Sequence, residues 1–269
     1  MFYNAKNGNL KIGNTDMDYI SFGTGKRVLV MIPGLGDGMM TVKGKALPFA
    51  WEYRMFAKDF TVYLFSRKNE LEEGCSIRDM AKDLKFAMDK IGIKKADIMG
   101  VSQGGMIAEY MAIDYPEVVN KLVLVVTVGR QNECIQSNVK KWIELAEQNR
   151  YGEAMKDITV RMYTPEYIQK YRLMLRMLAL FPGPKNKTRF LRMAKSCIEH
   201  SLFEELRQIK APAFIIGGER DQTVTGEASR EISEQIKNCE LYMYTEYGHG
   251  LYTEAKDFKQ RVYDFLYSN

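Results

Sequence analysis

The stretch DIMGVSQGGMIAEY, residues 97–110, places one serine between glycines where an apolar run of strand character gives way to a run of helix character. The pattern G-x-S-x-G around Ser102 is short enough to arise by chance, so its context decides its meaning. A serine on a sharp turn between a strand and a helix exposes its hydroxyl at the end of the strand. Flanking glycines let strand and helix approach closely. The context therefore indicates a nucleophile at Ser102.

Short β-rich runs alternate with helical segments along most of the chain, which is typical of an α/β fold with a mostly parallel sheet and helices on both faces. The pattern predicts about eight strands, the first two as an antiparallel pair. They are expected at 10–14, 17–23, 27–34, 60–67, 95–102, 121–129, 211–221 and 239–250. Helices are expected between them at 46–57, 76–92, 103–116 and 226–237, with a last helix at 255–268.

The alternation stops after Gly129, and about 80 residues have helical patterns only. The sequence therefore predicts a core in two parts, 1–129 and 211–269, with a helical cap or lid inserted at 130–210. We expect this insertion to pack on the main domain as a lid, because no linker-like stretch separates it from the core.

A serine nucleophile needs a neighbouring base and a third group that orients the base. The chain has only two histidines. His249, in YGHG, follows an apolar run and precedes the last predicted helix, whereas His200 lies in the helical insertion. We expect His249 to be the base and Asp221, in IIGGERD, to be the acid. Glu219 is the competing acid, but Asp221 lies deeper in the loop and is preferred.

An oxyanion formed at the substrate carbonyl needs backbone donors beside the nucleophile. The residue after the nucleophile, Gln103, is expected to supply one N–H group. The glycine-rich loop PGLGDG, residues 33–38, follows the first buried strand and permits close backbone approach. Leu35 in this loop is the expected second donor.

The segments IPGLGDG, GVSQGG, GGERD and YGHG, in this order, make the sequence similar to the α/β-hydrolase fold family over nearly its whole length. The resemblance is to lidded serine hydrolases such as carboxylesterases and lactonases. It implies a Ser102–His249–Asp221 triad that cleaves a small carboxylic ester, thioester or lactone through an acyl-enzyme, without a cofactor. Two departures stand out: Pro33 replaces the histidine common before the first oxyanion glycine, and Thr225 replaces a proline common after the acid.

Other functions occur on the same fold and stay open at this point, because fold alone does not determine function. The resemblance also admits carbon–carbon bond hydrolases, acyltransferases, peptidases acting on N-terminal proline, and cofactor-free haloperoxidases. A non-catalytic ligand-binding or receptor protein is the alternative outside enzymes. The intact set of catalytic residue types favours an enzyme.

Two features of the insertion suggest a substrate pocket. Within YRLMLRMLALF, residues 171–181, an apolar stripe at helical spacing could line an acyl pocket beneath the lid. Its members are Met174, Met177, Leu178 and Phe181. Arg172 and Arg176 are one helical turn apart and could meet a carboxylate of the substrate, although solvation of an exposed face is the simpler interpretation.

Composition narrows the remaining possibilities. The net charge is +5, but no nucleic-acid recognition motif accompanies it, so neither nucleic acid nor membrane is an expected partner. Apolar runs are too short to cross a bilayer, and the first residues lack the features of a secretory signal, so we expect a cytoplasmic protein. The four cysteines are far apart, which predicts reduced thiols and no metal site. We expect a monomer or homodimer acting on a small-molecule acyl substrate.

Overall fold

A twisted sheet forms the centre of the computed structural model, which describes residues 3–178, 180 and 182–268. Within these residues the sheet has eight strands in the order β1-β2-β4-β3-β5-β6-β7-β8. Their bounds are β1 Lys6–Ile12, β2 Thr15–Phe22, β3 Arg27–Ile32, β4 Phe60–Lys68, β5 Ala96–Val101, β6 Val119–Val125, β7 Ala213–Gly218 and β8 Cys239–Tyr244. Only β2 runs against its neighbours β1 and β4, and β3 to β8 are mutually parallel. The predicted α/β fold class is confirmed.

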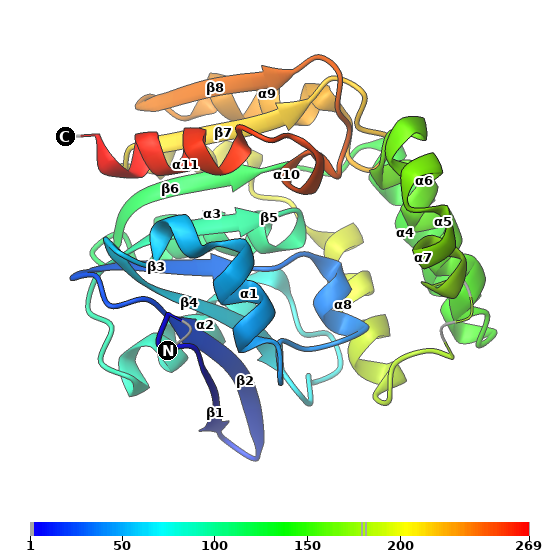
Figure 1. Cartoon of the computed structure of the whole chain (residues 1–269), viewed down its shortest axis with the longest axis horizontal. Helices are drawn as coiled ribbons and strands as arrows, with labels where there is room; N and C mark the ends of the chain where they lie inside the picture. The colour runs from blue at the N-terminus through cyan, green and yellow to red at the C-terminus, as the bar shows by residue number, and fades with distance from the viewer. Residues whose placement is uncertain (1–2, 179, 181, 269) are drawn as a thin grey trace.

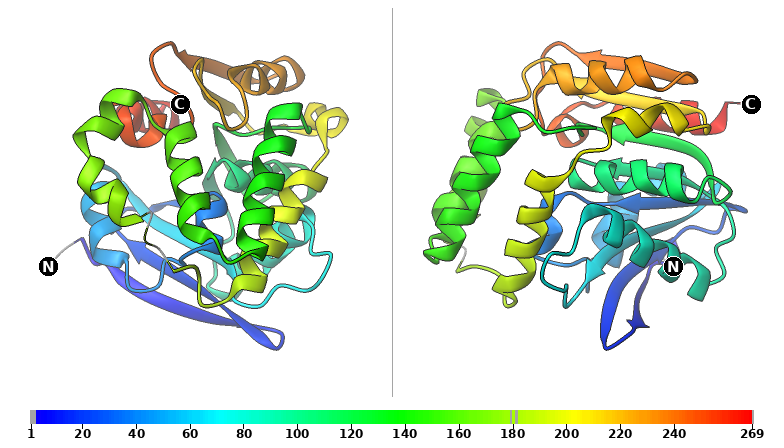
Figure 2. Two further views of the ribbon diagram at one scale, coloured as in Figure 1. Left: turned by 90° about the vertical axis from the view of Figure 1, so that its right-hand side faces the viewer. Right: turned by 180° about the vertical axis from the view of Figure 1, so that it is seen from behind.

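Helices cover both faces of this sheet (Figures 1 and 2). One face packs on α1 and α11, and the other on α2, α3 and α9. The bounds are α1 Ala46–Glu52, α2 Ile77–Lys90, α3 Gln103–Asp114, α9 Gly226–Gln235, α10 Leu251–Glu254 and α11 Phe258–Tyr267. Short 3-10 turns lie at Leu35–Gly38, Arg54–Phe56 and Phe203–Gln208. Buried strands such as β5, whose six residues are all buried, are therefore apolar throughout rather than alternating.

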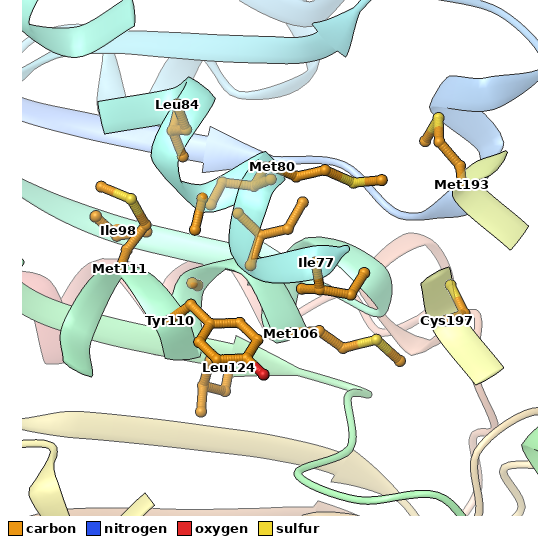
Figure 3. Close-up of a cluster of buried hydrophobic side chains, with 14 of the residues drawn as sticks. Ile77, Met80, Leu84, Ile98, Met106, Tyr110, Met111, Leu124, Met193 and Cys197 are labelled. Atoms are coloured by element: carbon orange, nitrogen blue, oxygen red, sulfur yellow. The ribbon is translucent and has the colours of Figure 1, made fainter. Parts of the chain in front are cut away.

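Helix α2 illustrates how local sequence places an element. Ser76 accepts a hydrogen bond from the backbone N–H of Asp79, and the Asp79 carboxylate accepts from the backbone N–H of Ser76, which fixes the start of the helix. Figure 3 shows Ile77, Met80 and Leu84 on the inner side of this helix, beside side chains of β5 and α3. Burial of this apolar stripe holds α2 on the sheet.

A run of helices connects β6 to β7 and lies beyond the carboxyl ends of the parallel strands (Figure 1). Its helices are α4 Glu133–Glu147, α5 Tyr151–Met162, α6 Pro165–Lys170, α7 Arg172–Leu178 and α8 Lys187–Glu199. Tyr171 separates α6 from α7. We refer to residues 133–199 as the inserted helices.

None of the described helices is long and apolar enough to span a membrane.

Candidate active site

Ser102 lies between β5 and α3 with backbone dihedrals φ +54° and ψ −122°, outside the conformations that a serine adopts without strain. The flanking glycines make this turn possible. A Cβ on Gly100 would lie 2.2 Å from the carbonyl oxygen of Gly104, and a Cβ on Gly104 would lie 2.0 Å from that of Ile32. The sharp turn therefore projects the hydroxyl away from the end of β5, as the strand-turn-helix pattern predicted.

The imidazole of His249 lies between Ser102 and Asp221. Its Nε2 is 3.0 Å from Ser102 Oγ, and its Nδ1 is 2.8 Å from Asp221 Oδ2. The side chain of Asp221 is 1% exposed and that of His249 is 5% exposed. With Nδ1 protonated, His249 donates to the carboxylate, and Nε2 can accept the proton of the serine hydroxyl. The structure thus brings together the three residues that the sequence pointed to.

The loop after β7 holds the Asp221 carboxylate in place. Asp221 Oδ1 accepts hydrogen bonds from the backbone N–H groups of Thr223, at 2.7 Å, and Val224, at 3.0 Å, which leaves Oδ2 for His249. Glu219, the competing acid, instead forms an ion pair with Arg230 on α9. The choice of Asp221 over Glu219 therefore agrees with the geometry.

Thr225 in the same loop explains one departure from the family pattern. Its backbone has φ +74° and ψ +148°. A proline ring holds φ near −65°, so proline does not fit this backbone. The loop that carries Asp221 therefore reaches α9 along a path that excludes proline at position 225.

The two expected oxyanion donors are both first residues of helical turns. Leu35 begins the turn Leu35–Gly38, and Gln103 begins α3, so neither N–H has an acceptor within its own helix. The loop passes beside the nucleophile, since a Cβ on Gly34 would lie 3.3 Å from Ser102 Cβ. Both N–H groups can therefore serve a negative oxygen next to Ser102.

A buried ionic cluster, which the sequence analysis missed, supports this loop from behind. Asp37 pairs with Arg189 of α8, with side chains 1% and 3% exposed. Asp37 Oδ2 also accepts from the backbone N–H of Arg67 at 2.9 Å. The Arg67 guanidinium donates to the carbonyl of Pro33 and, at 3.1 Å, to the side-chain oxygen of Gln103. Arg67 thus holds both Pro33, at the start of the oxyanion loop, and Gln103, the first residue of α3.

One signal could have revealed this cluster. Arg67 is a cation near the end of FTVYLFSRK, a strand that is otherwise largely apolar, and an arginine inside such a run needs a buried partner. Burial lowers the pKa of Arg67 to about 10, against the opposing effect of Asp37. The rest of the cluster could not be read from the sequence, because Asp37 is 30 residues from Arg67 and its ion-pair partner Arg189 is 152 residues from Asp37.

Ser102 and His249 open into a cavity of about 400 Å³. The sheet and α1 contribute Met31, Leu64, Met99 and Phe49, and the inserted helices contribute Trp142, Met155, Ile158, Met162 and Phe190. The lining is predominantly apolar, and its methionines are flexible enough to adapt to ligands of different shape.

The predicted pocket on the second half of the insertion needs correction. Met174 and Met177 are 49% and 68% exposed, and the described lining of the cavity comes from α4, α5 and α8 instead. Arg172 and Arg176 are also exposed on α7. The reason is physical: the apolar stripe identifies one face of the helix, but it does not determine what covers that face. The side chain of Leu178, and Phe181, lie outside the described residues.

His200, the second histidine, is buried directly after α8. Its Nε2 lies 3.1 Å from the carbonyl oxygen of Val128 and 3.3 Å from Glu109 Oε2. The side chains of His200 and Glu109 are both fully buried, and burial raises the pKa of Glu109 to about 7, despite the opposing effect of His200. This pair lies apart from Ser102 and links the end of α8 to α3. Among the described residues, no cluster of three side chains could hold a metal ion.

Comparison with known proteins agrees with this architecture. Residues 27–154 match the family model described as the alpha/beta hydrolase fold. A 2-hydroxy-6-oxononadienedioate/2-hydroxy-6-oxononatrienedioate hydrolase from Pseudomonas is 28% identical over 69% of this chain and 68% of its own length. Among solved structures, an α/β-hydrolase enzyme from a Medee basin deep-sea metagenome library superposes with a TM-score of 0.87, at 23% identity over 97% of this chain and 98% of that chain. The enol-lactonase of Burkholderia xenovorans superposes with a TM-score of 0.84, at 18% identity over 97% of this chain and 100% of that chain.

The protein therefore has the α/β-hydrolase fold, and its sequence is similar to hydrolases of that family.

Proposed function

We propose that the protein is a serine hydrolase that cleaves a small carboxylic ester, thioester or lactone through an acyl-enzyme on Ser102. The observation that carries this proposal is the hydrogen-bonded chain Asp221–His249–Ser102 at an apolar cavity. Apolar walls suit the hydrocarbon part of an acyl substrate, and they exclude water from the reacting centre.

In the proposed reaction, Ser102 Oγ attacks the carbonyl carbon while His249 Nε2 takes the hydroxyl proton. The N–H groups of Leu35 and Gln103 stabilise the tetrahedral oxyanion, and Asp221 stabilises the imidazolium. Collapse of the intermediate expels the alcohol, thiol or lactone oxygen, to which His249 returns the proton. Water then attacks the acyl-enzyme by the same steps in reverse and releases the acid.

The inserted helices are proposed to act as a cap, because they supply one wall of the cavity. Trp142, Met155 and Met162 line the cavity from the side opposite the sheet. A substrate bound between cap and core would be largely removed from water, which strengthens the electrostatic effect of the oxyanion donors.

Replacement of Ser102 with alanine tests the proposal. We expect kcat/KM for a short 4-nitrophenyl ester to fall by roughly 10⁴-fold or more, with an unchanged unfolding transition, because the nucleophile is lost and the fold is kept. Ser201→Ala, at an exposed serine, is the matched control and should keep full activity.

Labelling by a fluorophosphonate probe separates an enzyme from a non-catalytic binding protein. The wild-type protein should be labelled at Ser102, and the Ser102→Ala protein should not be. A folded wild-type protein that neither reacts with the probe nor turns over any ester, thioester or lactone would overturn the proposal.

A further inference from the structure

A single lysine, Lys45, lies in the described lining of the predominantly apolar cavity, which also includes the carboxylate of Asp37. Lys45 precedes α1, and its side chain lines the cavity together with Phe49 and Tyr53 of the same helix face. Residues four apart on a helix lie on one side, so these three form a row along the wall. The ammonium group of Lys45 has one hydrogen-bond partner in the described chain, the carbonyl oxygen of Met40 at 3.3 Å.

The charge near Lys45 is not balanced within the described residues. No carboxylate there lies within 4.0 Å of its ammonium group. The carboxylate that acts on Lys45 at longer range is Asp37, but Asp37 is already paired with Arg189, and the Arg67 guanidinium lies close behind it. Three cationic side chains therefore share one carboxylate at this side of the cavity. A bound carboxylate would offset part of this excess positive charge.

Burial also removes part of the hydration of the Lys45 ammonium group. Lys45 is half-buried, and burial lowers the pKa of its ammonium group, with Asp37 opposing the effect. A partly desolvated ammonium gains more from a carboxylate partner than an exposed one does, since the surrounding dielectric is lower.

The two ends of the row face different parts of the molecule. The centre of the Tyr53 ring lies 5.5 Å from Nζ of Lys259 on α11, the helix that follows the His249 loop and α10. Lys45 is eight residues away along the chain, a rise of about 12 Å if the helix geometry continues over this length. Its ammonium group lies beside the carbonyl oxygen of Met40. Lys45 would therefore meet a substrate at the end of the row away from Tyr53.

We propose that Lys45 is a specificity-determining residue that binds a second carboxylate of the acyl substrate. The inference rests on the proposed function, and it names the substrate class: monoesters, thioesters or lactones of acids that carry a second, ionised carboxyl group. It replaces the expectation that Arg172 and Arg176 would provide this contact, since both are exposed on α7.

The test compares two ester series of equal chain length. The first consists of 4-nitrophenyl monoesters of adipic to azelaic acid, which carry a free carboxylate, and the second consists of the corresponding esters of monocarboxylic acids. The quantity compared is kcat/KM for the anionic ester divided by kcat/KM for the neutral ester. We expect Lys45→Met to reduce this ratio by about tenfold or more, mainly by raising KM for the anionic ester, because a charge-assisted contact is lost. Lys45→Arg should retain most of the ratio, and Lys43→Met, at an exposed neighbouring lysine, should leave it unchanged.

A binding measurement tests the inference independently of turnover. Calorimetry on the Ser102→Ala protein should show adipic acid monoamide binding at least about tenfold more tightly than hexanamide, and Lys45→Met in the same background should remove this difference. Equal ratios in Lys45→Met and wild type, or equal binding of the two amides, would overturn the role of Lys45. If the wild-type protein turned over no ester but the difference in affinity between the two amides were present, the proposed hydrolysis alone would be overturned.

Discussion

Helices α8 and α7 belong to the same insertion but meet the rest of the molecule in different ways. Helix α8 is anchored by buried polar contacts: Arg189 pairs with Asp37, and the Gln103 side chain donates to the carbonyl of Met193 at 2.7 Å. Helix α7 presents large apolar side chains to solvent, with Leu173 73% exposed and Met177 68% exposed. Within the proposed cap, α8 is therefore a fixed wall of the site, whereas α7 is a surface element.

The largest effect is expected on breaking the ion pair of α8. Arg189→Met should reduce the free energy of unfolding by about 3–5 kcal/mol, because it leaves Asp37 as a buried carboxylate without its partner. Chemical denaturation measures this loss. Arg176→Met in α7 is the matched control, and we expect a change within about 0.5 kcal/mol, as for an exposed position. Similar losses in both variants would contradict the comparison.

The Glu109–His200 pair at the end of α8 should make stability depend on pH. The pKa of Glu109 is raised from 4.5 to about 7, chiefly by burial, so between these values the folded protein holds a proton that the unfolded chain has released. Its contribution to stability is therefore complete below about pH 4.5 and is lost as pH rises through about 7.

Replacing the carboxyl group tests this dependence. In Glu109→Gln, the contribution of this group to the decline of unfolding free energy between pH 5 and 7 should disappear, so the slope against pH becomes less negative than in wild type. Denaturant titrations at several pH values measure the slope. Glu117→Gln, at an exposed glutamate, should keep the wild-type slope, and an unchanged slope in Glu109→Gln would refute the assignment.

The smallest effect is expected on α7 itself. The double variant Met174→Gln/Met177→Gln should keep the wild-type kcat/KM for a neutral ester, because both side chains are exposed. Met155→Gln on α5 should lower kcat/KM, since it introduces an amide into the apolar wall of the cavity. Ester kinetics on the two proteins decide the point: a loss in the α7 variant as large as that in Met155→Gln would place α7 at the substrate.

The elements that the sequence predicted well depend on local rules. Ser102 could be recognised because a serine on a sharp strand-to-helix turn needs glycine neighbours, and His249 because the chain has only one other histidine. The strands and helices could be predicted for the same reason. Each has a local hydrophobic pattern that shows which of its residues are buried.

The features that the sequence did not reveal depend on contacts between distant residues. Asp37 and Arg189 are 152 residues apart, and nothing near either residue identifies the other as its partner. Met174 and Met177 of the predicted stripe lie outside the described lining of the cavity for a related reason, because amphipathic spacing is the same whether the apolar face meets a ligand, another helix or solvent. Lys45 resembled an ordinary surface lysine until the cavity was known.

The backbone of Thr225 has a consequence for engineering. Substituting the residue most common among relatives is a standard way to stabilise an enzyme, and at this position the family pattern would suggest proline. With φ at +74°, that substitution would force the chain between Asp221 and α9 into a new path. The carboxylate that orients His249 depends on backbone donors in the same short loop. Proline, the residue of the family pattern, is therefore a poor choice at position 225, and the residue best suited to this backbone is glycine.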